Sequence, residues 1–365
     1  MLRLFEPTEI SGMTIKNRFV RSATWVGMAA GNGACTPKLV DTIVMLAKGG
    51  VGLIISGHAY VQKQGQAGPW QLGIYEDRLV PGLRGMTDAV HEHGGKIIAQ
   101  LAHSGLFADP ALTGHAPLAP SAIAGVTRHT VREMTLQTIR NLVQAFGLAA
   151  ERAQEAGFDG VQLHSAHGYL LSQFLSPFFN RRADRYGGSL ENRVRIHIEI
   201  LEAIRSRVGG LYPVLIKINT RDFVGGGLEV EDSIRAGQLL QQRGVDAIEL
   251  SGGTVLSGKL SPIRSQIRNE GDEAYFRDYA VAFKNRVNLP IMLVGGVRSF
   301  DVAGQIVNNG IADYISMSRP FIREPDLVKR WESGDRTKAA CISCNKCLVE
   351  ARTGKGVYCV TKGGR

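Results

Sequence analysis

The segment LQTIRNLVQAFGLAAERAQEAGFDGVQLHSA, residues 136–166, contains a helix and a strand in the order that decides the fold. Its apolar residues recur at helical spacing on one stripe. They are Leu142, Val143, Phe146, Ala149, Ala150 and Ala153. Gly157 ends this pattern, and the short apolar run that follows is typical of a buried strand. We therefore predict a helix from Leu136 to Ala156 and a strand from Gly160 to Ala166.

The same alternation of strand and helix recurs along the whole chain. Almost continuous hydrophobicity in each Val- and Ile-rich run predicts a parallel strand that is buried on both faces. The eight predicted strands are Arg18–Thr24, Val51–Gly57, Lys96–Ala102, Gly160–Ala166, Pro213–Asn219, Ala247–Gly252, Ile291–Gly296 and Tyr314–Arg319. An open sheet would also fit, but polar and glycine residues gather after the carboxyl ends of the strands, where barrel enzymes carry their active sites. We therefore predict a TIM (β/α)8 barrel.

The length of 365 residues fits one such barrel, so a second domain is not required. We assign residues 1–333 to the barrel and residues 334–365 to a C-terminal tail, which holds four of the five cysteines. Residues 103–133 form a Pro-containing excursion after the third strand. Long excursions at the catalytic end of a barrel are often functional, so we expect a lid or a pocket wall here.

Composition and charge exclude several classes of protein. Hydrophobic residues make up 44% and charged residues 21%, as in ordinary globular proteins. We find no apolar run that resembles a membrane span or a signal peptide, and we expect a cytoplasmic protein with no membrane partner. The net charge is +10, but Lys and Arg are scattered, which argues against a nucleic-acid partner. The positive charge instead favours anionic cofactors and phosphates.

The densest group of reactive side chains lies in LHSAHGYLLSQFLSPFFNRRADRYGGSLENR, residues 163–193, which begins at the end of the fourth strand. His164 and His167 could ligate a metal, but no third ligand stands in an obvious position. They could also be ordinary core histidines. In a third interpretation, the two rings are N–H donors that stabilise negative charge on a substrate oxygen.

This segment resembles the signature of Old Yellow Enzyme relatives, which are FMN-dependent NAD(P)H oxidoreductases. Further matches are KNRFVRSAT at the start, AQLAHSG at the third strand, EAYF in the sixth helix and PIMLVGGVR at the seventh strand. The similarity covers about residues 4–330. The resemblance implies one FMN-binding barrel that uses NAD(P)H to reduce activated alkenes such as enones, enoates and nitro compounds.

The resemblance also implies three catalytic residues. His164 and His167 would bind the carbonyl or nitro oxygen of the alkene, and Tyr169 would lie beside the flavin. Hydride would pass from NAD(P)H to flavin N5 and then to the β carbon of the alkene, in a ping-pong sequence. Tyr169 or water would protonate the α carbon. Tyr169 could instead be a core aromatic residue, because a phenol with a pKa near 10 is a weak acid.

An FMN site across the mouth of the barrel follows from the same resemblance. Gln100 would bind the pyrimidine edge of the ring, and Lys217 would stand near N1 and O2, since a lysine inside VLIKIN needs a defined partner. His164 would also contact the flavin. Contacts at the ends of the first and second strands are expected from Ser22, Ala23, Thr24 and Gly57. The phosphate is expected at loops seven and eight, with Gly295, Gly296, Ser318 and Arg319.

Two features depart from the family pattern. Trp25 stands where the family usually has Thr or Cys beside flavin O4, so we expect its indole to form a wall of the substrate pocket. No glycine-rich dinucleotide fingerprint follows the barrel in this sequence. NAD(P)H would therefore enter the substrate pocket itself.

The tail contains Cys341, Cys344, Cys347 and Cys359, with eleven residues between the last two. This spacing suits a 4Fe-4S cluster and also suits tetrahedral zinc, and unmetallated thiols are a third interpretation. Similar spacings in the related dienoyl-CoA reductases and amine dehydrogenases favour iron. Cys35 stands apart and is expected to be a small hydrophobic residue.

The cysteine tail keeps two other functions open. The first is a dehydrogenase that oxidises an amine or another substrate and passes electrons from FMN through the cluster to a partner protein. The second is a flavin electron-transfer subunit without substrate turnover, against which the set of His164, His167 and Tyr169 argues. The sequence is compatible with NADH or NADPH as reductant and with an oligomer.

Overall fold

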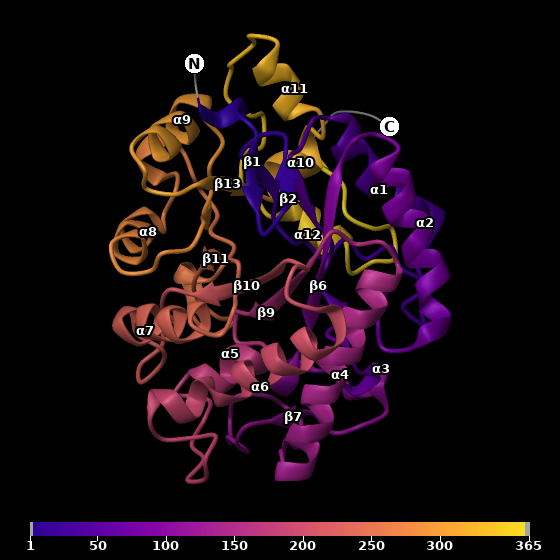
Figure 1. Cartoon of the computed structure of the whole chain (residues 1–365), viewed down its shortest axis with the longest axis vertical. Coiled ribbons are helices and arrows are strands. Elements are labelled where there is room, and N and C mark those ends of the chain that lie inside the picture. Colours follow the sequence, from indigo (N-terminus) through magenta and orange to yellow (C-terminus); the bar gives the residue numbers. More distant parts are fainter. Residues whose placement is uncertain (1–2, 362–365) are drawn as a thin grey trace.

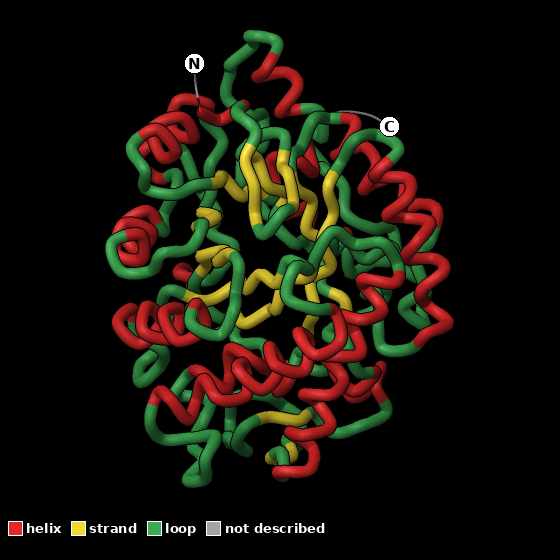
Figure 2. Tube along the Cα trace, in the orientation of Figure 1, coloured by secondary structure: helices red, strands yellow, loops and turns green. Residues whose placement is uncertain are grey.

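The computed structural model describes residues 3–361, and its eight central parallel strands close into a barrel (Figures 1 and 2). The strands are β3 (Phe19–Arg21), β4 (Leu53–Ile55), β6 (Lys96–Ala102), β9 (Val161–Ser165), β10 (Val214–Asn219), β11 (Ala247–Ser251), β12 (Ile291–Val294) and β13 (Tyr314–Met317). They pair in this order around the ring, and β13 pairs with β3 to close it. The predicted TIM barrel is confirmed.

Each of these strands lies within its predicted range, but several are shorter at the carboxyl end. The prediction for the first strand extended to Thr24, whereas β3 ends at Arg21. The next residues leave the sheet: Ser22 Oγ accepts a hydrogen bond from Lys217 Nζ, and Thr24 Oγ1 lies 2.6 Å from Ser318 Oγ. The residues that extend past the strands form the polar mouth of the barrel.

Helices surround the strands on the outside of the barrel (Figure 2). The main ones are α1 (Pro37–Lys48), α2 (Val80–His91), α4 (Leu136–Glu155), α6 (Leu190–Val208), α7 (Val230–Gln241), α8 (Arg277–Lys284) and α9 (Phe300–Asn308). Shorter helices are α3 (Pro110–Thr113), α5 (Leu170–Leu175), α10 (Arg319–Arg323), α11 (Leu327–Glu332) and α12 (Lys346–Glu350). Helix α4 buries the predicted apolar stripe, and Gly157 follows it with a φ of +82°. The side chain of Thr135 caps its start by accepting from Thr138 N.

A hairpin of β1 (Thr8–Ile10) and β2 (Met13–Ile15) closes one end of the barrel. Its buried side chains belong to the same apolar cluster as Leu53, Leu215 and Met292 in the barrel interior. Because this hairpin covers the end where the strands begin, the open end is the one where they finish. No helix in residues 3–361 is long and apolar enough to cross a membrane, and the cytoplasmic location stays a prediction.

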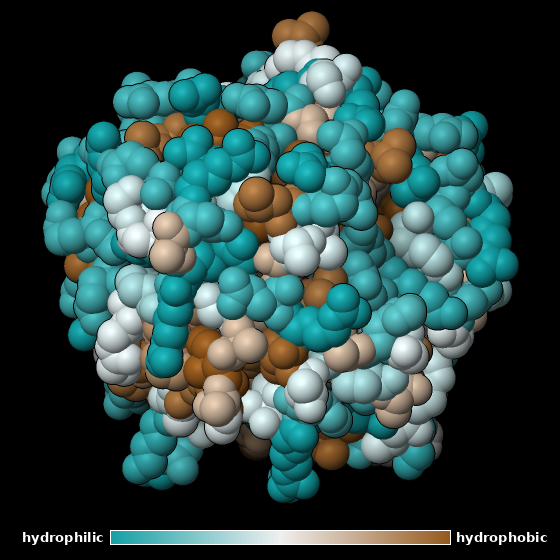
Figure 3. Space-filling view, turned by 90° about the horizontal axis from the view of Figure 1, so that it is seen from below, coloured by the Kyte–Doolittle hydropathy of each residue, from teal (hydrophilic) through white to brown (hydrophobic). Residues whose placement is uncertain are grey.

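The excursion at residues 103–133 contains α3 and two short strands, β7 (Leu118–Ala119) and β8 (Arg132–Glu133), which pair in parallel. Helix α3 and strand β7 lie toward the lower end of the molecule in Figure 1. Figure 3 views the molecule from that end and shows hydrophilic side chains over much of the face, with smaller hydrophobic patches between them. Such a mixed surface is usual for the solvent-facing side of a folded domain.

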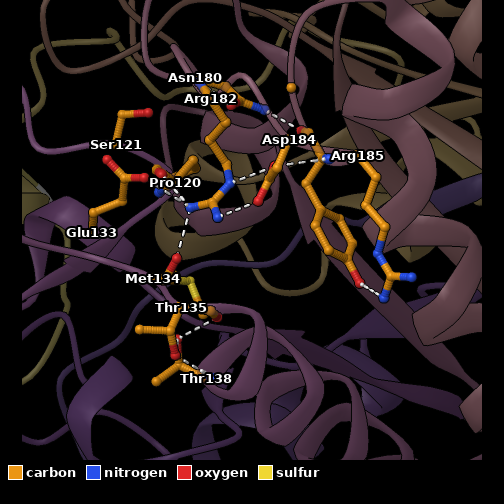
Figure 4. A network of polar contacts seen from close by, with 12 residues as sticks. Pro120, Ser121, Glu133, Met134, Thr135, Thr138, Asn180, Arg182, Asp184 and Arg185 are labelled. Atoms are coloured by element: carbon orange, nitrogen blue, oxygen red, sulfur yellow. Dashed lines mark hydrogen bonds and ion pairs between the residues drawn. The ribbon is translucent and has the colours of Figure 1, made fainter.

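Arg182, from the motif that begins at the fourth strand, fastens this excursion to the barrel (Figure 4). Its Nη1 donates to the carbonyl oxygens of Pro120 and Met134 at 2.8 and 2.7 Å. Its Nη2 forms an ion pair with Asp184 at 2.6 Å. Ser121 Oγ adds a bond by accepting from Arg181 N at 3.0 Å. This part of the motif therefore has a structural role.

The tail packs on the barrel along residues 334–361. Ala339 N donates to Arg298 O at 2.9 Å, and Val357 N donates to Val26 O at 2.8 Å. Gly27 marks the closest approach, because a Cβ added there would lie 2.1 Å from Ala351 O. The tail therefore returns to the strand ends at the mouth of the barrel.

Candidate active site

A cavity of about 480 Å³ opens at the carboxyl ends of the strands, and we call it the mouth cavity. Its wall comes from the strand ends and from two further segments. The loop after β11 contributes Val255, Ser261, Pro262 and Ile263, and the tail contributes Ser343, Leu348, Ala351 and Arg352. Within the described chain, residues 103–133 are not among those that line this cavity. The lid or pocket wall expected of this excursion stays a prediction.

The mouth cavity brings together most of the residues predicted for the site. On its wall are Ser22, Ala23, Thr24, Trp25, Gln100, His164, His167, Tyr169, Lys217, Gly296, Ser318 and Arg319. Gly57 and Gly295 are not among its lining residues. A Cβ on Gly57 would lie 2.9 Å from Thr24 O, and one on Gly295 would lie 3.2 Å from Tyr275 N. In the structure, both glycines therefore allow close contacts between neighbouring segments of the chain.

His164 lies near the end of β9, and His167 lies just beyond that end. The centroids of the two rings are 5.2 Å apart, and the ring planes meet at 75°. His167 has a left-handed backbone with φ of +65°, and its N–H donates to Asn219 Oδ1 at 3.0 Å. This conformation is uncommon outside glycine and typical of functional sites. His167 Nε2 lies 2.7 Å from Ser251 Oγ, whereas His164 Nδ1 is buried without a partner in the structure. The two rings are therefore not equivalent.

Burial determines the charge of this histidine pair. It lowers the pKa of both rings well below the ordinary value of 6.5, and the charge of Lys217 acts in the same direction. Each ring is therefore neutral at pH 7, with one N–H donor and one acceptor nitrogen. Neutral N–H donors of this kind can stabilise charge on a substrate oxygen.

Tyr169 stands immediately before α5, and its ring centroid lies 4.9 Å from that of His164. Burial raises the pKa of its phenol to about 12, although the charge of Arg352 opposes the shift. The phenol therefore keeps its proton at neutral pH. This arrangement is compatible with the predicted role as proton donor.

His58 is a wall residue that the sequence interpretation missed. Its Nε2 lies 3.3 Å from Tyr169 Oη, and its ring makes an edge contact with Trp25 at 6.5 Å. Burial lowers its pKa to about 4, so the ring is neutral. Its position could have indicated its role, because His58 stands three residues after β4 and other polar wall residues also follow strand ends.

Lys217 belongs to a buried polar network beneath the mouth cavity. Its Nζ donates to Ser22 Oγ at 2.8 Å and lies 3.2 Å from a carboxylate oxygen of Glu249. Burial alone would raise the pKa of Glu249, but Lys217 and hydrogen bonds from Ser316 and Gln162 hold it below its usual value. Glu249 is therefore the partner that this buried lysine needs, and Lys217 also lines the mouth cavity.

The side-chain amide of Gln100 completes this network. In the assigned orientation, Nε2 donates to Gln162 Oε1 at 2.7 Å. Because this bond uses the amide nitrogen, the carbonyl oxygen of Gln100 is the atom of this side chain that can accept a hydrogen bond from a ligand. A flavin ring offers one N–H donor on its pyrimidine edge, which matches this acceptor.

These groups fit FMN as a donor set. Gln100 would provide an acceptor and Lys217 a cation for the ring, while Arg298 and Arg319, which line the same cavity as Gly296, would provide cations for the phosphate. Arg298 lies inside PIMLVGGVR but was not singled out from the sequence. The mouth cavity also has a volume in the range typical of small-molecule sites.

The EAYF motif has a different place from the one predicted. Residues 273–276 precede α8 and do not form part of it. The carboxylate of Glu273 accepts from Arg298 N at 2.8 Å and from Ser299 N at 2.9 Å. Glu273 thus fixes the loop that leads from β12 into α9.

The tail cysteines lie near the same cavity but are not arranged as a metal site in the structure. Among residues 3–361, no group of three or more His, Cys, Asp or Glu side chains is placed to hold a metal ion. Burial, and next the neighbouring Cys341, raises the pKa of Cys347 to about 11, and Cys344 and Cys359 act in the same direction. The four thiols are therefore close enough to influence one another. Cys35 lies apart, and burial raises the pKa of its thiol to about 11.

Comparison with known proteins decides the family. The sequence model of the NADH:flavin oxidoreductase / NADH oxidase family matches residues 3–338. The chain belongs to this family. An old yellow enzyme homologue from Zymomonas mobilis has the same fold, with a TM-score of 0.78 and 28% identity over 93% of this chain and 95% of its own. The family resemblance seen in the sequence is confirmed.

Two curated relatives of this flavin oxidoreductase chain differ in length. A metal reductase from Desulforamulus reducens is 36% identical over 98% of this chain and 53% of its own length. A 4,4'-dithiodibutanoate disulfide reductase from Rhodococcus erythropolis is 31% identical over 98% of this chain and 95% of its own length. The chain therefore spans about half of the first relative and nearly all of the second.

Proposed function

We propose that this chain binds FMN and uses NAD(P)H to reduce activated C=C bonds of enones, enoates or nitroalkenes. The observation that carries the proposal is that His164, His167 and Tyr169 share one cavity wall with Lys217 and Gln100. The first three can activate an acceptor, and the other two suit a flavin ring. Membership of the NADH:flavin oxidoreductase / NADH oxidase family supports the flavin and the nucleotide.

FMN, when bound, would supply the hydride-transfer chemistry that links NAD(P)H to the β carbon of the alkene. Gln100 would hold the pyrimidine edge of the ring. Lys217 would stand at the edge that becomes more negative on reduction, and a cation there favours the negative form. The buried Glu249 keeps Lys217 in place at 3.2 Å.

The histidine pair and Tyr169 would act on the substrate. The neutral rings of His164 and His167 would donate to its carbonyl or nitro oxygen, where negative charge develops as hydride arrives. Nδ1 of His164 has no hydrogen-bond partner among the described residues, so this ring can form a further hydrogen bond. Tyr169 would hold a proton for the α carbon, because its raised pKa keeps the phenol protonated.

Two measurements test this function. The purified protein should contain noncovalent FMN, released on denaturation. Under anaerobic conditions, NADH or NADPH should bleach the flavin absorbance in a stopped-flow instrument, and cyclohex-2-enone should then restore it. Colourless protein that gains no flavin absorbance on incubation with FMN would overturn the proposal. Flavin that is reduced by nucleotide but never reoxidised by enones or nitroalkenes would overturn the alkene-reducing part.

The tail supports a second candidate, in which a substrate reduces FMN and electrons leave through a 4Fe-4S cluster to a partner protein. The spacing of Cys341, Cys344, Cys347 and Cys359 favours it, because four thiolates with one remote member suit such a cluster. Tail residues Ser343 and Leu348 line the mouth cavity, so the cysteines lie close to the expected flavin. A pure electron-transfer subunit is less well supported, because the cavity is open and carries the histidine pair.

Metal analysis after anaerobic purification tests this second candidate. A cluster predicts about four iron and four sulfide per chain, and structural zinc predicts about one zinc ion. Neither metal near those ratios would mean that the four cysteines are not a filled metal site. The NAD(P)H-driven reductase would then be the better supported function.

A further inference from the structure

The described wall of the mouth cavity carries positive charge without a carboxylate. Its ionic side chains are Lys217, Arg298, Arg319 and Arg352, and no Asp or Glu is among the lining residues. The histidines on the wall are neutral, because burial lowers the pKa of each. Lys217 and Arg298 have buried carboxylates behind the wall, Glu249 at 3.2 Å and Glu273 at 3.9 Å, so the cations of the described wall without a carboxylate partner are Arg319 and Arg352. Uncompensated cations of this kind attract anions to a cavity.

Three of the four cations are already engaged by the protein. Lys217 pairs with Glu249. The guanidinium of Arg298 donates to the carbonyl oxygens of Cys341 and Ile267. Arg319 Nη1 donates to Arg264 O at 2.7 Å and to Asn345 Oδ1. These contacts hold the three side chains in fixed positions around the expected flavin and its phosphate.

Arg352 differs from the other three. It is exposed at the rim, and in the described chain no hydrogen bond or ion pair of its guanidinium is found. Its guanidinium carbon lies 5.9 Å from the centroid of the Trp25 ring, and its charge lowers the pKa of Tyr169 against the effect of burial. Arg352 therefore lies beside Trp25 on the wall of the mouth cavity.

We propose that Arg352 binds a carboxylate on the electrophilic substrate, so that the mouth cavity selects anionic acceptors over neutral ones. A planar guanidinium can donate two parallel hydrogen bonds to a carboxylate. The Trp25 ring holds the guanidinium by a cation–π contact, which reduces the freedom lost on binding. No wall carboxylate competes for it. This inference rests on the proposed function, because it names the substrate class of the same site.

Two substrates that differ in the negative charge of one carboxylate test this preference. We would compare 3-oxocyclohex-1-ene-1-carboxylate with its methyl ester, which has the same enone but no charge. Dissociation constants are measured from the shift of flavin absorbance in the oxidised holoenzyme, and rates are measured in the oxidative half-reaction. The unmodified protein should prefer the carboxylate, and the preference should shrink as salt is added.

Three variants test the residue. Arg352→Met should reduce the preference for carboxylate over ester about tenfold or more, and Arg352→Lys should restore part of it. The control is Arg336→Met. Arg336 is also an exposed tail arginine over an aromatic ring, 4.7 Å from Phe300, but it does not line the mouth cavity. That control should keep the full preference.

The possible outcomes separate the inference from the proposed function. Equal affinity for carboxylate and ester, or an equal loss of both in Arg352→Met, would overturn the role of Arg352 while enone reduction stands. A loss confined to NAD(P)H binding in the reductive half-reaction would also overturn it, because the arginine would then bind the nucleotide phosphates. Failure of both substrates to reoxidise the flavin would instead overturn the proposed function.

Discussion

Two parts of the mouth cavity wall differ in how they are held, one built from strand ends and one from the tail. On the strand-end wall, Lys217 and His167 are held by buried partners on other barrel strands or directly after them. The tail wall includes the exposed Arg352 and rests on contacts such as the one between Val357 and Val26. Under the proposed function, the barrel scaffold would position the reacting groups, while the tail would adjust which molecules enter.

The largest effect is expected on the strand-end wall. Replacing His164 and His167 together with Ala should slow enone reduction by about 10⁴-fold, because each lost donor costs roughly a hundredfold. The affinity of the site for a phenol added as a ligand should also fall. The measurement is the oxidative half-reaction of flavin-loaded protein, with flavin content as the control. Turnover at the original rate would show that the pair is structural.

A smaller effect on the same wall is expected at Tyr169. Tyr169→Phe should slow the oxidative half-reaction about a hundredfold for substrates whose carbanion needs a proton, and should leave the reductive half-reaction unchanged. His58→Leu should have a weaker effect of the same kind, because His58 contacts the phenol at 3.3 Å. If His58 acts through Tyr169, the double variant will be no slower than Tyr169→Phe alone. Additive losses would contradict that link.

The contact between the tail and the barrel can be tested at Gly27. This glycine has a φ of +61°, and a Cβ there would lie 2.1 Å from Ala351 O. Gly27→Val should therefore loosen the tail, at a cost of about 1–3 kcal/mol, while the barrel keeps its flavin. Limited proteolysis should detect earlier cleavage after residue 334. Gly31→Val is the control, since a Cβ on Gly31 meets nothing within 4 Å. Identical cleavage in both variants would mean that the tail does not depend on this contact.

The smallest effect is expected from pH. The pKa values of His164 and His167 are lowered well below 6.5, so these rings gain protons only in acid. The pKa of Tyr169 is about 12, so the phenol loses its proton only in strong base. The oxidative half-reaction should therefore be nearly flat from about pH 6 to pH 9. A limb with an apparent pKa near 6.5 would show that one histidine is solvated and not buried.

Much of the barrel could be predicted from the sequence, because its signals are local. The apolar stripe of α4 follows from the helical period, and each strand is a short apolar run between polar loops. His164, His167 and Tyr169 could be placed in one site because His164 lies near the carboxyl end of such a strand and the other two follow that end. In a parallel barrel, all such positions meet at one end.

The tertiary structure decided which other residues reach that end. The register of β10 and β11 places Lys217 opposite Glu249, and no local pattern indicates that pairing. Arg352 reaches the mouth cavity because the tail returns to Gly27, whereas the excursion at residues 103–133 is held elsewhere by Arg182. These positions depend on contacts between segments far apart in the sequence. Periodicity reports how one segment buries its own side chains, and it carries no information about which distant segment will cover them.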